Sequence, residues 1–282
     1  MSFLSKILPL FLCLSLGGEL YAQKGWELGL NVGVANYFGD LNTNYSFREL
    51  GPAAGFMARY NFNTRVALRI DGNYARIGAD DANSSNNFER ARNLSFFSNV
   101  YDGEMALEFN FLNYVHGSRD EFFTPYLFAG FAVVNFDPKT EFEGETVLLQ
   151  PLGTEGQFRG EEYSRTQGAF AFGGGMKVDL SYRWSLNFEL SARRMFTDYI
   201  DDVSTVYADV EDIRNLRGDQ AADLSDRSIL IQGVNDNLIG QPGRQRGDST
   251  GNDTYASFKV GLLYYFGELR CPEYGSRRRR RR

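Results

Sequence analysis

The sequence predicts an all-β protein: an eight-stranded antiparallel transmembrane β-barrel with long extracellular loops and a short periplasmic C-terminal tail. Phe, Tyr and Trp make up 15% of the 282 residues and Gly is abundant. After residue 22, however, no apolar run approaches the roughly 20 residues that a membrane-spanning helix needs. Eight segments alternate apolar with polar or small residues, and the connections between them are alternately short and long. Both patterns are typical of barrels in the bacterial outer membrane.

The first 22 residues have the composition of an export signal. Lys6 supplies a positive charge, the apolar run Ile7–Leu16 follows, and Leu20-Tyr21-Ala22 ends in a small residue suited to cleavage. Cys13 lies inside the apolar run without small residues directly before it, which disfavours a lipoprotein signal. A buried N-terminal helix is disfavoured because no amphipathic pattern surrounds the run. We therefore expect a signal peptide at 1–22, the barrel at 23–267 and a periplasmic tail at 268–282.

The first four predicted strands alternate clearly. In 26–34, Trp26 and the even-numbered Leu and Val residues oppose Glu27, Gly29 and Asn31. In 55–62, Phe and Tyr oppose a set that includes Arg59. Segments 65–74 and 101–111 repeat the pattern, with charged residues on the inward side. Apolar side chains facing lipid and polar ones facing the lumen explain all four segments.

The last four predicted strands follow the same rule with one exception. Segments 170–180, 184–193 and 256–266 alternate regularly, and the third ends on Phe266, a placement that resembles the C-terminal signal read by the barrel-insertion machinery. Segment 126–136 is apolar at both odd and even positions, so the sequence predicts a strand there without assigning its faces. A soluble β-sandwich also alternates, but seldom needs so many long strands with aromatic ends.

The connections predict the orientation of the barrel. The connections 63–64 and 181–183 are tight and 112–121 is moderate, whereas 38–50, 77–93, 137–164 and 196–253 are long. Short periplasmic turns and long extracellular loops alternate in this way in outer-membrane barrels. Both termini of the barrel should then lie on the periplasmic side.

The predicted lumen carries charges of both signs. Side chains fill the interior of an eight-stranded barrel, and buried charges persist only when they are paired. We therefore expect a salt-bridged polar core and no substantial pore. The inward charged residues are Arg59, Arg69, Asp71, Glu104, Glu108, Lys177, Asp179, Glu189, Arg193 and Lys259.

No catalytic, cofactor or metal site is indicated. His116 is the only histidine, and its predicted periplasmic turn makes it an exposed residue without catalytic partners. Gly173-Gly174-Gly175 lies within a strand, so it should thin the barrel wall rather than bind phosphate. The residues Asp198, Asp201, Asp202, Asp209, Glu211 and Asp212 should form a solvated acidic loop, with calcium binding as the alternative.

The tail combines a lone thiol with positive charge. After export Cys271 is the only cysteine, which excludes an intramolecular disulfide and leaves an intermolecular one available in the oxidising periplasm. Arg277–Arg282 contribute six positive charges to a chain of net charge −6, so the remainder is twice as acidic. The tail should therefore make an electrostatic contact. The alternative is a disordered tail with an idle cysteine.

Five short stretches together resemble the PorG family, the outer-membrane barrel component of the type IX (Por) secretion system. They are NYFGDL at 36–41, LSFFSNVYD at 94–102, LGTEGQ at 152–157, TDYIDDVSTVY at 197–207 and RCP at 270–272. The resemblance covers most of the mature chain. The run Arg277–Arg282 departs from the family pattern.

The resemblance implies a non-enzymatic component of the secretion apparatus that anchors the periplasmic ring of PorK and PorN to the outer membrane. The candidate partner-binding residues are Cys271, Pro272, Arg277 and Arg278. The alternative is a generic OmpA- or OmpX-like barrel with structural or adhesive loops, and a lipid-A-modifying enzyme comes third. Besides outer-membrane lipid and the ring proteins, we expect no cofactor and no nucleic-acid partner.

Overall fold

The computed structural model describes residues 24–267, and eight of the strands in this range close into an up-and-down antiparallel barrel. Each barrel strand pairs with its neighbours in the chain, and β9 closes the barrel on β1. The short β6 extends β5 as a hairpin. The predicted fold class is confirmed. The strands are β1 (Gly25–Phe38), β2 (Gly51–Asn61), β3 (Val66–Asp80), β4 (Ser95–Asn110), β5 (Phe123–Phe142), β6 (Glu145–Leu148), β7 (Thr166–Asp179), β8 (Trp184–Met195) and β9 (Thr254–Tyr265).

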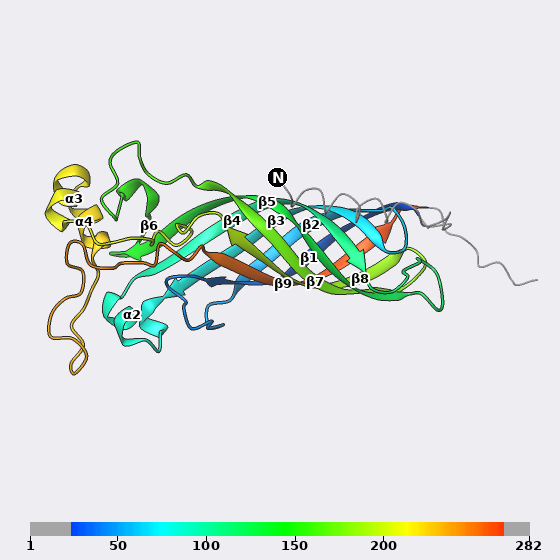
Figure 1. The fold of residues 1–282 in the computed structure, drawn as a ribbon, viewed down its shortest axis with the longest axis horizontal. Coiled ribbons are helices and arrows are strands. Elements are labelled where there is room, and N and C mark those ends of the chain that lie inside the picture. The colour runs from blue at the N-terminus through cyan, green and yellow to red at the C-terminus, as the bar shows by residue number, and fades with distance from the viewer. Residues whose placement is uncertain (1–23, 268–282) are drawn as a thin grey trace, which may run out of the picture.

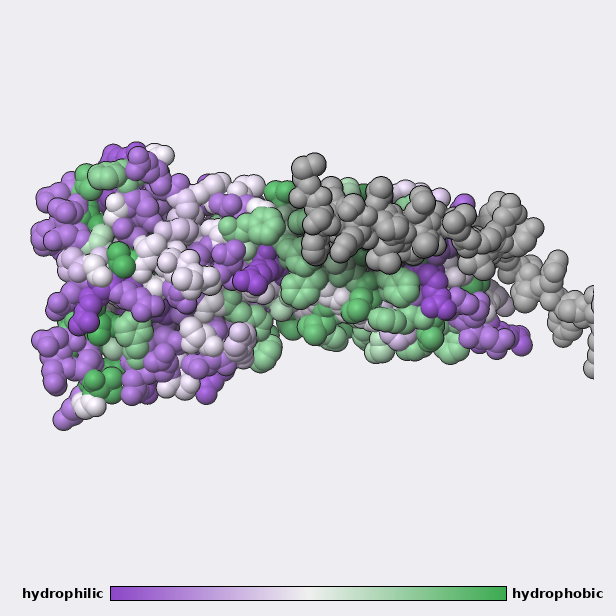
Figure 2. Space-filling model, in the orientation of Figure 1, coloured by the Kyte–Doolittle hydropathy of each residue, from purple (hydrophilic) through white to green (hydrophobic). Residues whose placement is uncertain are grey.

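The barrel wall carries an apolar band, seen as the green area on the face shown in Figure 2. Leu30 and Phe131 on this band are 68% and 65% exposed. Near the short turns, aromatic rings pair along its edge, as Trp26 does with Tyr60 at a centroid distance of 5.1 Å. An apolar band edged by aromatic residues is what a bilayer requires of a barrel, so the protein resides in the outer membrane. No helix within residues 24–267 is long and apolar enough to span a bilayer.

The two ends of the barrel differ in size (Figure 1). The short connections and the barrel termini share one end, since the start of β1 lies beside the end of β9. The long loops fold at the other end, as predicted. They contain the helical segments η1 (Asp81–Asn83), α2 (Asn87–Arg92), η2 (Gln150–Leu152), α3 (Val210–Arg217) and α4 (Asp219–Ser225).

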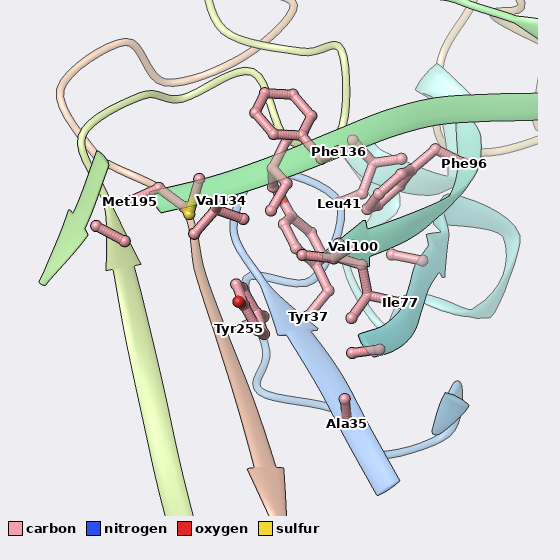
Figure 3. Close-up of a cluster of buried hydrophobic side chains, with 14 of the residues drawn as sticks. Ala35, Tyr37, Leu41, Ile77, Phe96, Val100, Val134, Phe136, Met195 and Tyr255 are labelled. Atoms are coloured by element: carbon pink, nitrogen blue, oxygen red, sulfur yellow. The ribbon is translucent and has the colours of Figure 1, made fainter. Parts of the chain in front are cut away.

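Apolar side chains fill the half of the interior nearer the long loops (Figure 3). Val134 and Phe136 of β5 point inward and pack with Tyr37 of β1 in one buried cluster. Ile200 and Val203 of the last loop join the same cluster. The long loops are therefore packed onto the barrel as a cap, and are not independent excursions into solvent.

Apolar clusters inside the barrel explain the strand that the alternation could not orient. Tyr126 and Phe128 face inward in β5, and Leu127 and Val133 face outward. Both parities of the segment are apolar because lipid lies on its outer side and two apolar clusters lie on its inner side: Tyr126 and Phe128 pack with Ala106, and Val134 and Phe136 belong to the upper cluster. In addition, β3 and β5 run further into the predicted long loops than expected, to Asp80 and Phe142.

Candidate functional site

Three of the stretches that carry the family resemblance meet around one buried tyrosine at the outer end. The hydroxyl of Tyr37, at the end of β1, donates to Asp201 Oδ2 (2.5 Å) and shares a hydrogen bond with Asp253 Oδ1 (2.7 Å). Its ring meets that of Phe96, from the second stretch, edge to face at 4.9 Å. Asp201 belongs to the fourth stretch. The contacts thus join residues more than 160 positions apart.

The stretch 152–157 completes the arrangement. Thr154 Oγ1 donates to Asp202 Oδ2 (2.6 Å), and Glu155 accepts from the backbone N–H of Ser204 (2.9 Å). Arg246 pairs with Glu155 at 3.1 Å and donates to the Asp202 carbonyl at 2.6 Å. The outer cap cluster, as we define it, comprises Tyr37, Phe96, Thr154, Glu155, Asp201, Asp202, Arg246 and Asp253.

The glycine of NYFGDL is required by this packing. A Cβ atom on Gly39 would lie 2.0 Å from both Asp253 Oδ1 and the Tyr37 hydroxyl. Any larger residue would therefore break the hydrogen bond that holds β1 to the end of the last loop.

Three carboxyl groups at the cap have pKa values above their usual range. Burial and the neighbouring Asp40 raise the pKa of Asp253 to about 8. Burial and the nearby Asp253 raise the pKa of Asp198 to about 8 as well. Burial likewise raises the pKa of Asp202 to about 6. A closely packed acidic group is tolerated here because part of it stays neutral near pH 7.

The expectation of a solvated acidic loop is wrong for half of the group. Asp198, Asp201 and Asp202 are buried in the cap. By contrast, Asp209 caps the N-terminus of α3 by accepting from the Glu211 N–H at 2.9 Å, where Asp212 is also exposed. Asp201 and Asp202 have partners far away in the sequence, Tyr37 and Thr154, which the local composition did not reveal. Among residues 24–267, no group of three or more Asp, Glu, His or Cys side chains is arranged to hold a metal ion.

The lower interior is a ladder of ion pairs. Arg59 pairs with Glu27 (2.9 Å) and Glu108 (3.0 Å), and Lys177 pairs with Glu108 (2.5 Å). All ten predicted lumen charges take part in ion pairs within 4.0 Å, so the salt-bridged core is confirmed. Glu27 and Asp102 also belong to the ladder. The prediction omitted them, although the alternation of their strands places both inward.

A second set of pairs lies above the first. Arg69 contacts Asp71 at 2.7 Å and Glu189 at 2.6 Å, and its guanidinium lies over the ring of Phe128, 3.9 Å from the centroid. Arg193 pairs with Glu104 at 2.7 Å. These charged residues are at most 2% exposed, so no water-filled channel passes between them.

The expectation that His116 is an exposed turn residue is wrong. The turn that carries it folds into the mouth of the barrel, where the imidazole contacts Glu27 (3.1 Å) and Asp179 (3.0 Å). Its ring stacks on Tyr265 at 4.2 Å. Burial lowers the pKa of His116, but Glu27 and Asp179 outweigh burial and raise it to about 9. A cationic His116 therefore closes the periplasmic mouth.

The glycine run in β7 does thin the wall, as predicted. A Cβ on Gly173 would lie 2.8 Å from the ring of Phe128, and one on Gly175 would lie 2.7 Å from the Tyr126 hydroxyl. The missing side chains make room for these two rings inside the barrel. The predicted partner-binding residues Cys271, Pro272, Arg277 and Arg278 and the signal peptide at 1–22 lie outside the described residues.

Residues 5–221 match the family DUF6089, described as a domain of unknown function. No curated protein matches the sequence of this chain. Three solved outer-membrane structures are similar in arrangement. They are Neisserial surface protein A (10% identity, TM-score 0.44, 86% of this chain and 97% of that one), OprG from Pseudomonas aeruginosa (10%, 0.39, 89% and 100%) and a major outer-membrane protein from Thermus thermophilus (12%, 0.37, 86% and 99%).

Proposed function

This chain belongs to the DUF6089 family, and we propose that it is a non-enzymatic component of the type IX secretion apparatus that anchors the periplasmic PorK/PorN ring to the outer membrane. The observation that carries the proposal is the outer cap cluster. Four of the five stretches that resemble the PorG family contact one another there, through Tyr37, Phe96, Glu155 and Asp201. The resemblance therefore concerns one packed unit and not scattered short matches.

The filled interior supports an anchor rather than a channel. Ion pairs occupy the lower half, apolar side chains occupy the upper half, and His116 closes the periplasmic mouth. A barrel of this kind offers the apparatus a stable fixture in the membrane, while the secreted protein crosses elsewhere.

The environment of His116 supports a role without catalysis. A general base needs access to a substrate proton and a pKa near the working pH. His116 is 3% exposed between two carboxylates, and its pKa of about 9 keeps it protonated. The proposal assigns no reaction to this chain.

One observation favours the alternative, a small barrel with structural or adhesive outer loops. The folded loops lie at the outer end, whereas the periplasmic connections are short. In the anchor proposal, contact with the ring therefore depends on the tail 268–282, which follows β9 at the periplasmic end. There we propose Cys271, Pro272, Arg277 and Arg278 as the contact residues, with a disulfide from Cys271 to a ring protein.

Cross-linking in native membranes tests the anchor directly. A photo-reactive residue placed at 272 should capture PorK or PorN, and the same residue at Phe158 on the outer cap should not. Replacing Arg277 and Arg278 by Ala should reduce the cross-link. A correctly folded protein that captures no ring component from any tail position would contradict the anchor and favour the alternative.

Non-reducing gels test the disulfide separately. With free thiols blocked, a band heavier than the monomer should appear, disappear with reductant and be missing in Cys271→Ser. Exclusively monomeric wild-type protein would rule out the covalent bond and leave a noncovalent anchor to the cross-linking result.

A further inference from the structure

A pocket of about 340 Å³ opens on the outer end of the molecule. One wall is the loop after β1 and the other is formed by the end of β3 and the start of the following loop. Its volume lies within the range of small-ligand sites, roughly 300–1,000 Å³. Its lining is mostly polar and includes Asn44, Ser46, Arg48, Glu49, Asp80 and Glu89.

The two walls are held together by hydrogen bonds. Arg48 Nη1 donates to the Asn83 carbonyl (3.1 Å), and Asn83 Nδ2 donates to Glu49 Oε1 (2.9 Å). Deeper in the pocket, the buried Glu89 accepts from Thr43 Oγ1 and Ser84 Oγ, each at 2.5 Å. The pocket is therefore a built feature whose walls cannot separate without breaking these contacts.

The lining suits a ligand rich in hydroxyl groups. Amide and hydroxyl side chains both donate and accept hydrogen bonds, and carboxylates accept from hydroxyls. Three carboxylates, Glu49, Asp80 and Glu89, face a single guanidinium, Arg48. That excess directs the hydroxyl-bearing part of a saccharide into the pocket and leaves any phosphate or carboxylate groups of the ligand outside it.

On the side opposite the pocket, the same loop presents aromatic side chains. While Asn44, Ser46 and Arg48 line the pocket, the intervening Tyr45 and Phe47 point outward, 71% and 65% exposed. Tyr45 has a left-handed backbone with φ of 52°, which is rare for a bulky residue, and its exposure leaves the ring itself largely uncovered. Strain of this kind gathers at functional positions.

This aromatic surface continues the lipid-facing wall. The ring of Phe38, at the upper end of β1, lies 5.5 Å from Tyr45 and 5.6 Å from Phe47. Below it on the same face of β1, Val34 and Val32 belong to the apolar band. Aromatic rings in this position sit at the level of lipid headgroups.

We propose that this loop binds a glycolipid of the outer leaflet, with its sugar headgroup in the pocket and the base of its acyl chains against Phe38, Tyr45 and Phe47. The single segment 44–48 serves both parts of such an amphiphile, because Asn44, Ser46 and Arg48 line the pocket while Tyr45 and Phe47 face the membrane. A free saccharide has no acyl chains to pack against the aromatic surface, and an ordinary phospholipid has no sugar headgroup to occupy the pocket.

Binding by the purified full-length chain in nanodiscs tests the site. The probes are lipopolysaccharide, its released core oligosaccharide and phosphatidylglycerol. Ser85→Trp fills the pocket from its exposed rim, and Tyr45→Ala with Phe47→Ala removes the aromatic surface. Each should weaken lipopolysaccharide binding at least tenfold. Gln232→Trp and Phe158→Ala, exposed positions elsewhere on the outer end, are the matched controls and should bind as wild type does.

The oligosaccharide separates the two parts of the site. It should bind more weakly than the glycolipid, lose binding in Ser85→Trp and be unaffected by the loss of Tyr45 and Phe47. Phosphatidylglycerol that competes as well as lipopolysaccharide would overturn the proposal, as would free oligosaccharide that binds as tightly as the whole lipid. Equal lipopolysaccharide binding by all variants, with circular dichroism spectra that match wild type, would also overturn it.

Discussion

The half of the barrel interior nearer the periplasm is filled by ion pairs, whereas the half nearer the outer loops is filled by apolar side chains. In the lower half, Arg59 and Arg69 each bridge two carboxylates. In the upper half, Val134 and Phe136 pack against residues of the loops. The lower half lies inside the lipid-facing band and the upper half continues beyond it into the cap.

The difference has a physical reason. Inside the band, lipid covers the outer wall, so each strand places apolar side chains outward and polar side chains inward. The inward charged side chains then pair with one another. Above the band, loops must be fixed to the barrel, and apolar burial does this without directional partners. One continuous set of strands therefore serves as a membrane anchor below and as the base of a folded cap above.

Breaking the charged half should have the largest effect. Arg69→Ala leaves Asp71, Glu104 and Glu189 without their shared cation. Removal of one partner from a buried ionic network costs about 4 kcal/mol. Urea unfolding in lipid vesicles should show this loss, and Arg194→Ala, an outward-facing arginine of β8, should change stability by less than about 0.5 kcal/mol. Equal effects would mean that the ladder is not stabilising.

Breaking the apolar half should cost somewhat less and act locally. Phe136→Ala leaves a cavity under the cap and should destabilise by about 3 kcal/mol. Hydrogen exchange should rise most in segment 196–253, whose Ile200 and Val203 share the cluster. Exchange in the lower parts of β1 and β2 should change little. A rise spread evenly over the barrel would contradict the division into two halves.

Removing His116 from the periplasmic mouth of the barrel should have a smaller effect on stability. His116→Ala deletes charged hydrogen bonds to Glu27 and Asp179, at a cost of about 2 kcal/mol at pH 7. The pKa of His116 rises from 6.5 to about 9 on folding, so its contribution is full below pH 6.5 and is lost as the pH rises through 9. Arg119→Ala in the same turn is the control. If the two variants have equal stability at pH 7, the contacts of His116 contribute nothing to stability.

The smallest expected effect concerns the pH response of the cap. The pKa of Asp198 rises from 3.8 to about 8 on folding, so its contribution is full below pH 3.8 and is lost as the pH rises through 8. Hydrogen exchange in 196–253, corrected for its intrinsic pH dependence, should therefore rise between pH 6 and pH 9. Asp198→Asn should reduce that rise, and an unchanged response would assign it to other groups.

The strands could be predicted because apolar residues that face lipid alternate with polar residues that face the lumen along each strand of a membrane barrel. The alternation of Trp26, Glu27 and Leu28 indicates which side of β1 faces lipid. The loop lengths indicate which end of the barrel is periplasmic and which is extracellular. The alternation fails only in 126–136, where lipid on the outside and apolar clusters on the inside give both faces the same chemistry. The sequence pattern fails there because of how the interior is packed, and that packing is known only from the structure.

The packed ends could not be predicted because their contacts are long-range. His116 lies 89 residues from Glu27, and nothing in its own turn indicates that the turn folds into the barrel mouth. Asp201 and Asp202 look like members of an acidic loop until Tyr37 and Thr154 are brought to them. The stretches 36–41, 152–157 and 197–207 lie far apart in the sequence, and their contact with one another is a property of the fold.

Planar-bilayer recording of the purified full-length chain tests most directly whether the interior is filled along its whole length. With ion pairs below, apolar packing above and His116 in the mouth, we predict no stable conductance steps between pH 6 and pH 8. Arg194→Ala should be equally silent. Large, long-lived steps from correctly folded wild-type protein would contradict a filled barrel and would remove the argument for an anchor over a channel.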